Sequence, residues 1–287
     1  MTERFTVALI QNHAGPEVGP NLEETQAMTR EAAARGAKLV MLPEYFSALD
    51  LKEGRLVFQA YPEAGHPALP AYRALARELG IWCQLGSLPI EATGGKVNNR
   101  GYLLDPEGAV VARYDKVHLF DVDLADGESY RESATIAPGD RAVLADLPWG
   151  KLGFSICYDL RFPQLYRALA QAGADFLTVP AAFTKTTGEA HWHVLLRARA
   201  IETGCYVLAP CQTGEHAGGG ACFGHSLVVD PWGRVIADGG AETGIVLAEI
   251  DPAEVTKARS MIPALQHDRP FAAPSGSMPQ RLAVGAA

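Results

Sequence analysis

The pattern of apolar and polar positions predicts short strands and helices that alternate along most of the chain. Apolar runs bounded by Gly or Pro are typical of buried strands, and apolar residues at three- and four-residue spacing are typical of helices. On this basis strands are expected at 5–11, 38–42, 81–87, 99–105, 109–114, 151–156, 175–180, 205–210, 225–230, 234–238 and 245–250. Helices are expected at 22–34 (with Asn21 as its N-cap), 68–79, 163–172, 190–203 and 252–259.

The order of these elements predicts an α/β protein in which helices cover mixed sheets. Strands that alternate with helices need helical layers over the sheet, whereas the turns at 105–108 and 230–233 join neighbouring strands into hairpins. No linker or change of composition divides the chain before residue 260, which favours a single domain over 1–270. The tail at 271–287 is rich in small residues and is expected to be disordered or to pack on a partner subunit.

Composition and charge narrow the class of protein. The 287 residues are 48% hydrophobic and 20% charged, which is ordinary for a globular chain with a large core. A net charge of −8, without a cluster of lysines or arginines, argues against a nucleic-acid groove. No apolar stretch reaches the roughly 20 residues of a membrane span. The N-terminal segment has no features of a signal peptide, so we expect a cytoplasmic protein.

The cysteines do not form a recognisable metal or disulfide pattern. Their odd number and the absence of CxxC spacing favour reduced thiols. Two of them lie near His216 and His225, but the spacing matches no common zinc site, so we expect neither a metal ion nor an organic cofactor. The five cysteines are Cys83, Cys157, Cys205, Cys211 and Cys222.

Cys157 lies where the sequence changes from a strand-like to a helix-like pattern. The apolar run at 152–156 precedes it, and from Phe162 onward apolar residues recur at helical spacing. A thiol at such a junction can be held rigidly in the positive field of a helix N-terminus, which favours a nucleophilic thiolate. A second interpretation stays open, because a single cysteine after an apolar run is often a small core residue.

Two further reactive side chains follow predicted strands in the same way. Glu44 comes after the strand at 38–42, and Lys116 comes after the strand at 109–114. Ligand sites in α/β sheets gather outside the carboxyl ends of strands, so both side chains could meet Cys157 in one pocket. Taken singly, each is better explained as a solvated surface charge. The long stretch at 119–139 is expected to be an irregular loop, of the kind that often carries function. The histidines available as an alternative base are His118, His191, His193 and His225.

Together, these segments resemble the nitrilase superfamily of carbon–nitrogen hydrolases, which uses a Glu–Lys–Cys triad. LPEY at 42–45 is similar to the family's Glu motif, YDKVHLF at 114–120 to its Lys motif, and ICYDLRFPQLYR at 156–167 to its Cys motif. The resemblance extends from about residue 5 to residue 267. It implies an αββα sandwich of mixed sheets, which in the family commonly pairs through helices into an αββααββα homodimer or a larger oligomer.

The resemblance also implies a role for each residue of the motifs. Glu44 would act as the proton shuttle and Cys157 as the nucleophile. Lys116 and the backbone N–H of Tyr158 would stabilise the oxyanion. A second family glutamate matches Glu132, although Glu128 lies close enough in the sequence to be an alternative. The side chains expected to contact substrate are Tyr45, Arg161, Phe183 and Thr184.

The implied reaction is hydrolysis of a linear amide to an acid and ammonia through a thioester acyl-enzyme. The segments at 188–216 and 224–240 are similar to the Nit amidases, especially those of deaminated glutathione, so a small carboxylate-bearing amide is the expected partner. Two alternatives within the family are ω-amidase action on short 2-oxo amides and hydrolysis of N-carbamoyl amino acids. The alternative outside enzymology is a thiol sensor or an inactive binding module.

Overall fold

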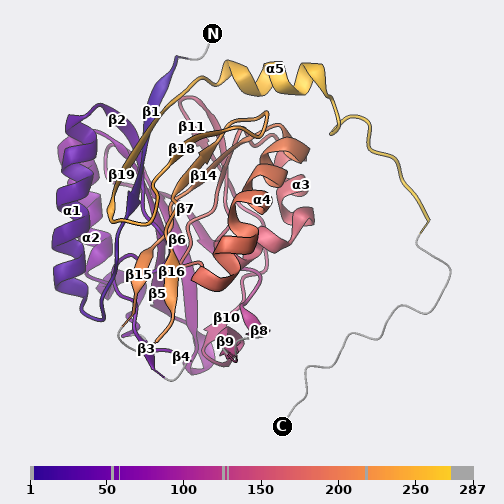
Figure 1. Ribbon diagram of the computed structural model, residues 1–287. Helices are drawn as coiled ribbons and strands as arrows, with labels where there is room; N and C mark the ends of the chain where they lie inside the picture. The colour runs from indigo at the N-terminus through magenta and orange to yellow at the C-terminus, as the bar shows by residue number, and fades with distance from the viewer. Residues whose placement is uncertain are drawn as a thin grey trace.

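The computed structural model describes residues 3–52, 55–57, 59–124, 127, 129–216 and 219–272. Two β-sheets face each other between two pairs of helices, in the order helices, sheet, sheet, helices (Figure 1). This arrangement confirms the predicted αββα sandwich. The helices are α1 (Val18–Ala34), α2 (Ala68–Leu79), α3 (Pro163–Gln171), α4 (Lys185–Thr203) and α5 (Ala253–Met261). No helix in the described ranges is long and apolar enough to cross a membrane.

The first sheet has seven strands and is covered by α1 and α2 on its outer face. Its central strands β1, β2 and β5 are parallel, and β19 and β6 flank them in the antiparallel sense. The strands in spatial order are β10 (Ile136–Ala137), β6 (Val97–Leu104), β5 (Trp82–Glu91), β2 (Ala37–Met41), β1 (Phe5–Gln11) and β19 (Gly244–Ile250), and β7 (Val110–Asp115) also pairs with β6.

The second sheet has six strands and is covered by α3 and α4. β12, β13 and β14 are parallel, and antiparallel strands lie at both edges. Its strands are β11 (Leu144–Leu147), β12 (Gly150–Gly153), β13 (Phe176–Thr178), β14 (Tyr206–Ala209), β17 (Leu227–Val229) and β18 (Val235–Asp238). The remaining strands form the pairs β3 (Leu51–Lys52) with β4 (Arg55–Leu56), β8 (Asp121–Asp123) with β9 (Ser129–Arg131), and β15 (Thr213–Glu215) with β16 (Ala221–Phe223).

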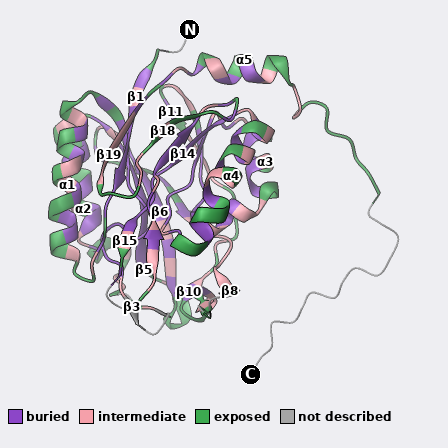
Figure 2. Cartoon of the chain, viewed as in Figure 1, coloured by how far each residue is buried: buried purple, intermediate pink, exposed green. Residues whose placement is uncertain are grey.

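Strand β1 shows how one strand contributes to two cores. Val7 and Leu9 pack between the two sheets, whereas Ala8 and Ile10 point to the opposite face, beneath α1 and α2. All four side chains are fully buried. A strand covered on both faces is apolar at successive positions, which is why this run was recognisable in the sequence. Figure 2 shows the same division, with buried residues in the sheets and exposed residues on the outer faces of the helices.

Helix α1 begins at Val18, earlier than predicted, and Asn21 is not its N-cap. The buried Asn21 side chain instead holds the preceding loop: it accepts from the N–H of Gly15 at 3.0 Å and donates to the carbonyl oxygen of Ser47 at 2.9 Å. Pro20 is compatible with the early start, because N–H groups in the first turn have no intrahelical acceptor.

Helix α4 also begins earlier than predicted, at Lys185 rather than at residue 190. The first turn is polar and contains Gly188, so the pattern of apolar residues did not indicate the start of the helix. The glycine has a packing reason: a Cβ at position 188 would lie 2.4 Å from the ring of Phe223, so only glycine allows α4 to contact β16 this closely.

The stretch at 119–139, predicted to be an irregular loop, contains regular structure. It folds into the β8–β9 hairpin, the 3₁₀ turn η3 (Glu132–Ala134) and strand β10. Short strands of two or three residues carry too little alternation to be read from a sequence. The alternative glutamate, Glu128, lies outside the described residues. Residues 273–287 of the predicted tail also lie outside the described residues, so the prediction for the tail stays untested.

Candidate active site

A cavity of about 460 Å³ opens at the ends of strands from both sheets. Glu44, Lys116, Glu132 and Cys157 all line it, so the structure brings together the four side chains that the sequence motifs singled out. They come from segments as far apart as residues 44 and 157. The predicted substrate-contacting residues Tyr45, Phe183 and Thr184 also line this cavity, as does Tyr158, the predicted oxyanion donor.

The Lys116 ammonium is bound between two buried carboxylates. Its Nζ lies 2.9 Å from Oε1 of Glu44, and 3.0 and 2.9 Å from Oε1 and Oε2 of Glu132. The side chains are almost fully buried, with exposed fractions of 2% for the lysine and 3% for each glutamate. Buried charges are tolerated only when they are paired, so these three groups form one electrostatic unit.

Neutral donors fix the orientation of both carboxylates. The amide Nδ2 of Asn99 donates to Oε1 of Glu44 at 2.8 Å and lies 3.4 Å from Glu132. The backbone N–H of Ala182 donates to Oε2 of Glu44 at 2.9 Å, and that of Phe120 to Oε2 of Glu132 at 2.6 Å. Sequence reasoning missed Asn99. Strand β6 also contains Asn98 and Arg100, so nothing in the local sequence distinguished Asn99 from its polar neighbours.

Glu44 is carried by a backbone segment that approaches strand β5 unusually closely. A Cβ on Gly86 would lie 2.2 Å from the carbonyl oxygens of both Leu42 and Pro43, so only glycine fits at this position. The next residue, Ser87, accepts a hydrogen bond from the N–H of Tyr45 at 3.1 Å. These contacts fix the segment that places the carboxylate in the cavity.

Cys157 lies on a turn between strand and helix, as predicted, but the strand ends at Gly153 and the turn is a 3₁₀ segment, η4 (Cys157–Arg161). Its φ of +48° is in the left-handed region, which is unfavourable for a residue with a Cβ. The Cys157 N–H donates to the carbonyl oxygen of Pro180 at 2.9 Å and holds this conformation. Such strain is concentrated at functional sites, where the surrounding structure imposes it.

The buried Asp159 links the cysteine turn to the lysine segment. Its Oδ2 accepts from the hydroxyl of Tyr114 at 2.7 Å and from the N–H of Ile156 at 2.9 Å. Its Oδ1 accepts from the backbone N–H of His118 at 3.0 Å and lies 2.7 Å from Nδ1 of the same residue. One carboxylate therefore binds residues on both sides of Lys116 and the residue before Cys157.

The protonation states of the cavity follow from burial and from these charges. Burial raises the pKa of the Cys157 thiol well above its usual value, and Glu44 raises it further while Lys116 opposes the change. Burial disfavours the charged form of Lys116, yet Glu132 and Glu44 outweigh it and its pKa is raised. Burial also raises the pKa of Glu132, against the effect of Lys116. The Cys157 side chain is thus a thiol at rest, and not the thiolate that a helix terminus would favour.

Two arginines lie near the cavity in different ways. Arg161, predicted to contact substrate, is not among the lining residues; its guanidinium lies 5.8 Å from the ring centroid of Tyr158 and 5.5 Å from that of Phe183. Arg131 lines the cavity and pairs with Asp123 at 2.7 Å. The sequence did not indicate Arg131, because it lies in the hairpin that was expected to be irregular.

The cysteine and histidine residues considered as a zinc pattern do not form one cluster in the structure. Nε2 of His216 lies 3.2 Å from Sγ of Cys222 in the cavity wall, and burial lowers the pKa of His216 to about 4. Burial also raises the pKa of the Cys222 thiol. These two groups are therefore a neutral hydrogen-bonded pair. His225 lies elsewhere, beside Asp238.

Comparisons with known proteins show which proteins this chain is similar to. The model of the family described as carbon-nitrogen hydrolase matches residues 6–260. A deaminated glutathione amidase from Synechocystis sp. is 42% identical over 268 residues, which cover 92% of this chain and 97% of the relative. Omega-amidase NIT2 from Homo sapiens is 36% identical over 266 residues, with 92% and 95% covered. The crystal structure of the C. elegans NitFhit protein matches with a TM-score of 0.85 and 36% identity, covering 93% of this chain and 66% of that longer chain.

Proposed function

Because this chain belongs to the carbon–nitrogen hydrolase family, we propose that it is a cysteine-dependent amidase acting on a small carboxylate-bearing amide. One observation carries the proposal: the Lys116 ammonium, bound to the Glu44 and Glu132 carboxylates at 2.9 Å, shares a cavity with the Cys157 thiol. A nucleophile, a base and a fixed positive charge are the components that acyl transfer requires. The relatives named as amidases support the same reaction class.

In the first half of the reaction, the Cys157 thiol loses its proton to Glu44 as its sulfur attacks the amide carbon. A base is needed because the raised pKa of the thiol keeps it protonated at neutral pH. The carbonyl oxygen gains negative charge, which Lys116 Nζ and the N–H of Tyr158 stabilise. Tyr158 is in the first turn of η4, where N–H groups have no acceptor within the turn.

In the second half, Glu44 returns the proton to the amide nitrogen, and the amine leaves a thioester on Cys157. Water then enters, gives a proton to Glu44 and attacks the thioester carbon. The sulfur leaves, takes the proton back and releases the carboxylic acid. The sum is amide plus water to acid plus amine. Glu132, which holds Lys116 through both oxygens, serves as a positioning residue.

Deaminated glutathione is the substrate that the relatives favour. Its scissile amide nitrogen belongs to the cysteinyl residue, so the leaving amine is a dipeptide, and ammonia is released only from primary amides. The expectation that ammonia is the product therefore applies to the ω-amidase alternative, which the 36% identity to an omega-amidase keeps open. A cavity of about 460 Å³ is within the usual range of small-molecule sites, roughly 300–1,000 Å³.

A substrate panel tests the specificity. Deaminated glutathione and 2-oxoglutaramate both yield 2-oxoglutarate on hydrolysis, so one assay of that acid compares kcat/KM for the two, and ammonia should appear only with the second. N-carbamoyl amino acids would release carbon dioxide as well as ammonia. We expect deaminated glutathione to have the highest kcat/KM. Preference for 2-oxoglutaramate would assign the chain to the ω-amidase alternative.

A matched pair of variants tests the mechanism. Glu44→Gln and Glu132→Gln each remove one carboxylate that binds Lys116, but only the first removes the proposed base. We expect mass spectrometry to detect an acyl group on Cys157 in the wild-type protein and to lose it in Glu44→Gln, with a smaller loss of turnover in Glu132→Gln. Equal losses would contradict the assignment of Glu44 as the base. Ligand binding without any acyl-enzyme would support the sensor or binding-module alternative.

We further propose that residues 1–270 form one catalytic domain and that the protein acts in the cytoplasm as a homodimer. Exposed apolar side chains on α4 support an interface there: Val194 is 66% exposed and Ile201 is 56% exposed. Light scattering should give twice the chain mass. Replacing both residues with aspartate should give a monomer, because two charges would then be buried at the interface. An unchanged dimer in that variant would exclude this face of α4.

A further inference from the structure

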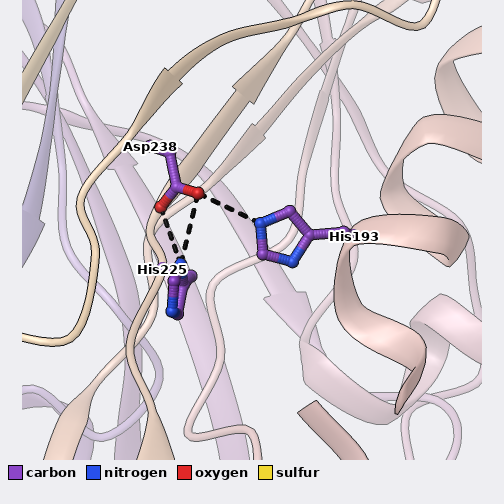
Figure 3. A group of neighbouring side chains, drawn as sticks. All are labelled: His193, His225 and Asp238. Atoms are coloured by element: carbon purple, nitrogen blue, oxygen red, sulfur yellow. Dashed lines mark hydrogen bonds and ion pairs between the residues drawn. The ribbon is translucent and has the colours of Figure 1, made fainter. Parts of the chain in front are cut away.

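A cluster of two histidines and one aspartate lies outside the catalytic cavity (Figure 3). His193 comes from α4, His225 from the segment between β16 and β17, and Asp238 from the end of β18. Asp238 accepts from both imidazoles: its Oδ2 lies 3.1 Å from Nε2 of His193, and its Oδ1 lies 2.9 Å from Nδ1 of His225. None of the three is among the described residues that line the cavity.

We propose that His193, His225 and Asp238 form a binding site for a first-row divalent metal ion, with Zn²⁺ as the best-matched ion. Two imidazole nitrogens and one carboxylate oxygen are ligands that this ion prefers. In a tetrahedral site, Zn²⁺ bonds of roughly 2.0–2.2 Å place neighbouring ligand atoms about 3.3–3.6 Å apart. Oδ2 of Asp238 lies 3.1 Å from Nε2 of His193 and 3.2 Å from Nδ1 of His225, so one carboxylate oxygen is already near that spacing from both nitrogens. Candidate ligand atoms of all three side chains lie within 4.8 Å of one another.

The ligands are held in place by groups around them. The N–H of Gly240 donates to Oδ1 of Asp238 at 2.9 Å, and the His225 ring stacks on Phe223 with centroids 4.4 Å apart. Trp192 Nε1 donates to the carbonyl oxygen of His225 at 2.8 Å. Such outer contacts orient metal ligands and lower the cost of assembling a site.

The position of the cluster indicates what a bound ion would do. It would join α4 to the hairpin formed by β17 and β18. In this region, packing and hydrogen bonds hold the helix against the hairpin. The side chains of His193, His225 and Asp238 are 36%, 28% and 34% exposed, so an ion can enter and water can complete its coordination. An ion outside the cavity would stabilise the fold rather than take part in the chemistry.

The three positions are too far apart in the chain for a spacing motif to reveal them. His225 was considered in the sequence with nearby cysteines, which the structure places elsewhere. The alternative explanation is that Asp238 simply accepts hydrogen bonds from two neutral or charged histidines. Two measurements distinguish these explanations. When an ion is added, only a metal site makes the protein more stable and gives a spectrum that depends on the ligands.

The test uses the full chain, stripped with a chelator and dialysed against Zn²⁺ and, separately, Co²⁺ as a spectroscopic probe. We expect one equivalent of Zn²⁺ per chain and a higher Tm with Zn²⁺ than without it. Bound Co²⁺ should show ligand-field bands without the intense charge-transfer band of a thiolate ligand. Binding that shows the thiolate band would locate the ion at a cysteine and overturn the proposal.

Single variants complete the test. His193→Ala, His225→Asn and Asp238→Asn should each weaken Zn²⁺ binding at least tenfold and abolish the shift in Tm. Asparagine is chosen at position 225 because φ is +53° there, and asparagine tolerates that conformation. The exposed His267 provides the control, since His267→Ala should bind as the wild type does. Equal binding by Asp238→Asn and the wild type would overturn the proposal, as would no binding by the wild type.

Discussion

The two sheets contribute different chemistry to the same cavity. The charged groups belong to the first sheet: Glu44 follows β2, Lys116 follows β7 and Glu132 precedes β10. The second sheet contributes a neutral thiol and a backbone donor, since Cys157 follows β12 and Ala182 follows β13. One sheet thus assembles and pairs the buried charges, and the other presents the thiol that we propose forms the covalent bond. The groups whose pairing affects stability therefore lie on one sheet, and the proposed nucleophile lies on the other.

Buried polar contacts connect these two contributions, among them the Gln212 amide, which donates to the carbonyl oxygens of Glu44 and Tyr45 at 2.8 and 3.1 Å. The Ala182 N–H binds Glu44 from across the interface between the sheets, and Asp159 binds Tyr114 and His118. The comparison of the two sheets therefore predicts three kinds of defect in variants of this protein. Changes on the second sheet should affect turnover alone, changes on the first should affect turnover and stability, and changes at the connection should affect geometry.

The largest expected effect is that of Cys157→Ala. Without the sulfur no thioester forms, and we expect kcat to fall by about 10⁴–10⁶-fold, as when other covalent enzymes lose the nucleophile. Stability should change little, because the side chain is small and alanine keeps the Cβ, so the strain of the left-handed backbone is the same in both proteins. Product release under single-turnover conditions and urea unfolding measure the two quantities. A large loss of stability would remove the distinction between the sheets.

The next effect is that of Lys116→Met, which leaves two buried carboxylates without their counter-ion. Loss of an oxyanion donor should lower kcat by about 10²–10³-fold, and breaking a buried ion pair should cost about 3 kcal/mol of unfolding free energy. Urea unfolding and steady-state kinetics test both expectations. As a control, Lys116→Met combined with Glu132→Gln should recover stability but not turnover, because the excess negative charge is removed while the donor stays absent. Recovery of turnover would contradict the role of Lys116.

A smaller effect is expected at the connection between the sheets. In Asp159→Asn an amide NH₂ replaces one of two accepting oxygens, so the contact to Tyr114 or to His118 is lost. Displacement of catalytic groups by about 1 Å can cost about 10²-fold, and we expect kcat to fall by about 10–10²-fold with KM less affected. Asp230→Asn is the matched control, because Asp230 accepts from the N–H groups of Trp232 and Arg234 in a distant turn. Similar kinetic losses in both variants would indicate general destabilisation.

The sequence revealed the reactive side chains better than the contacts that control them. Glu44, Lys116 and Cys157 were candidates because each follows a predicted strand, and strand ends in α/β sheets meet at one edge. The resemblance of their segments to the nitrilase motifs then singled them out. Asn99 and Arg131 were missed, since a polar residue within a strand and an arginine in a short hairpin have no periodic signature. Helix starts were wrong at α1 and α4 for a related reason: each first turn contains a glycine and lacks a repeat of apolar residues. Contacts between residues that lie far apart in the sequence cannot be read from local patterns.

The smallest predicted effect concerns the thiol before substrate binds. Burial and Glu44 raise the pKa of Cys157 well above its usual value, so the thiolate fraction at neutral pH is low. Raising the pH removes protons, and below the pKa each unit should increase the thiolate, and hence alkylation by iodoacetamide, about tenfold. We therefore expect the rate of inactivation to rise from pH 7 to pH 9 without a plateau, measured as residual activity with the modified residue identified by mass spectrometry. A plateau near pH 7 would mean that the first sheet holds the thiol as a thiolate at rest, and the division of roles between the sheets would then be wrong.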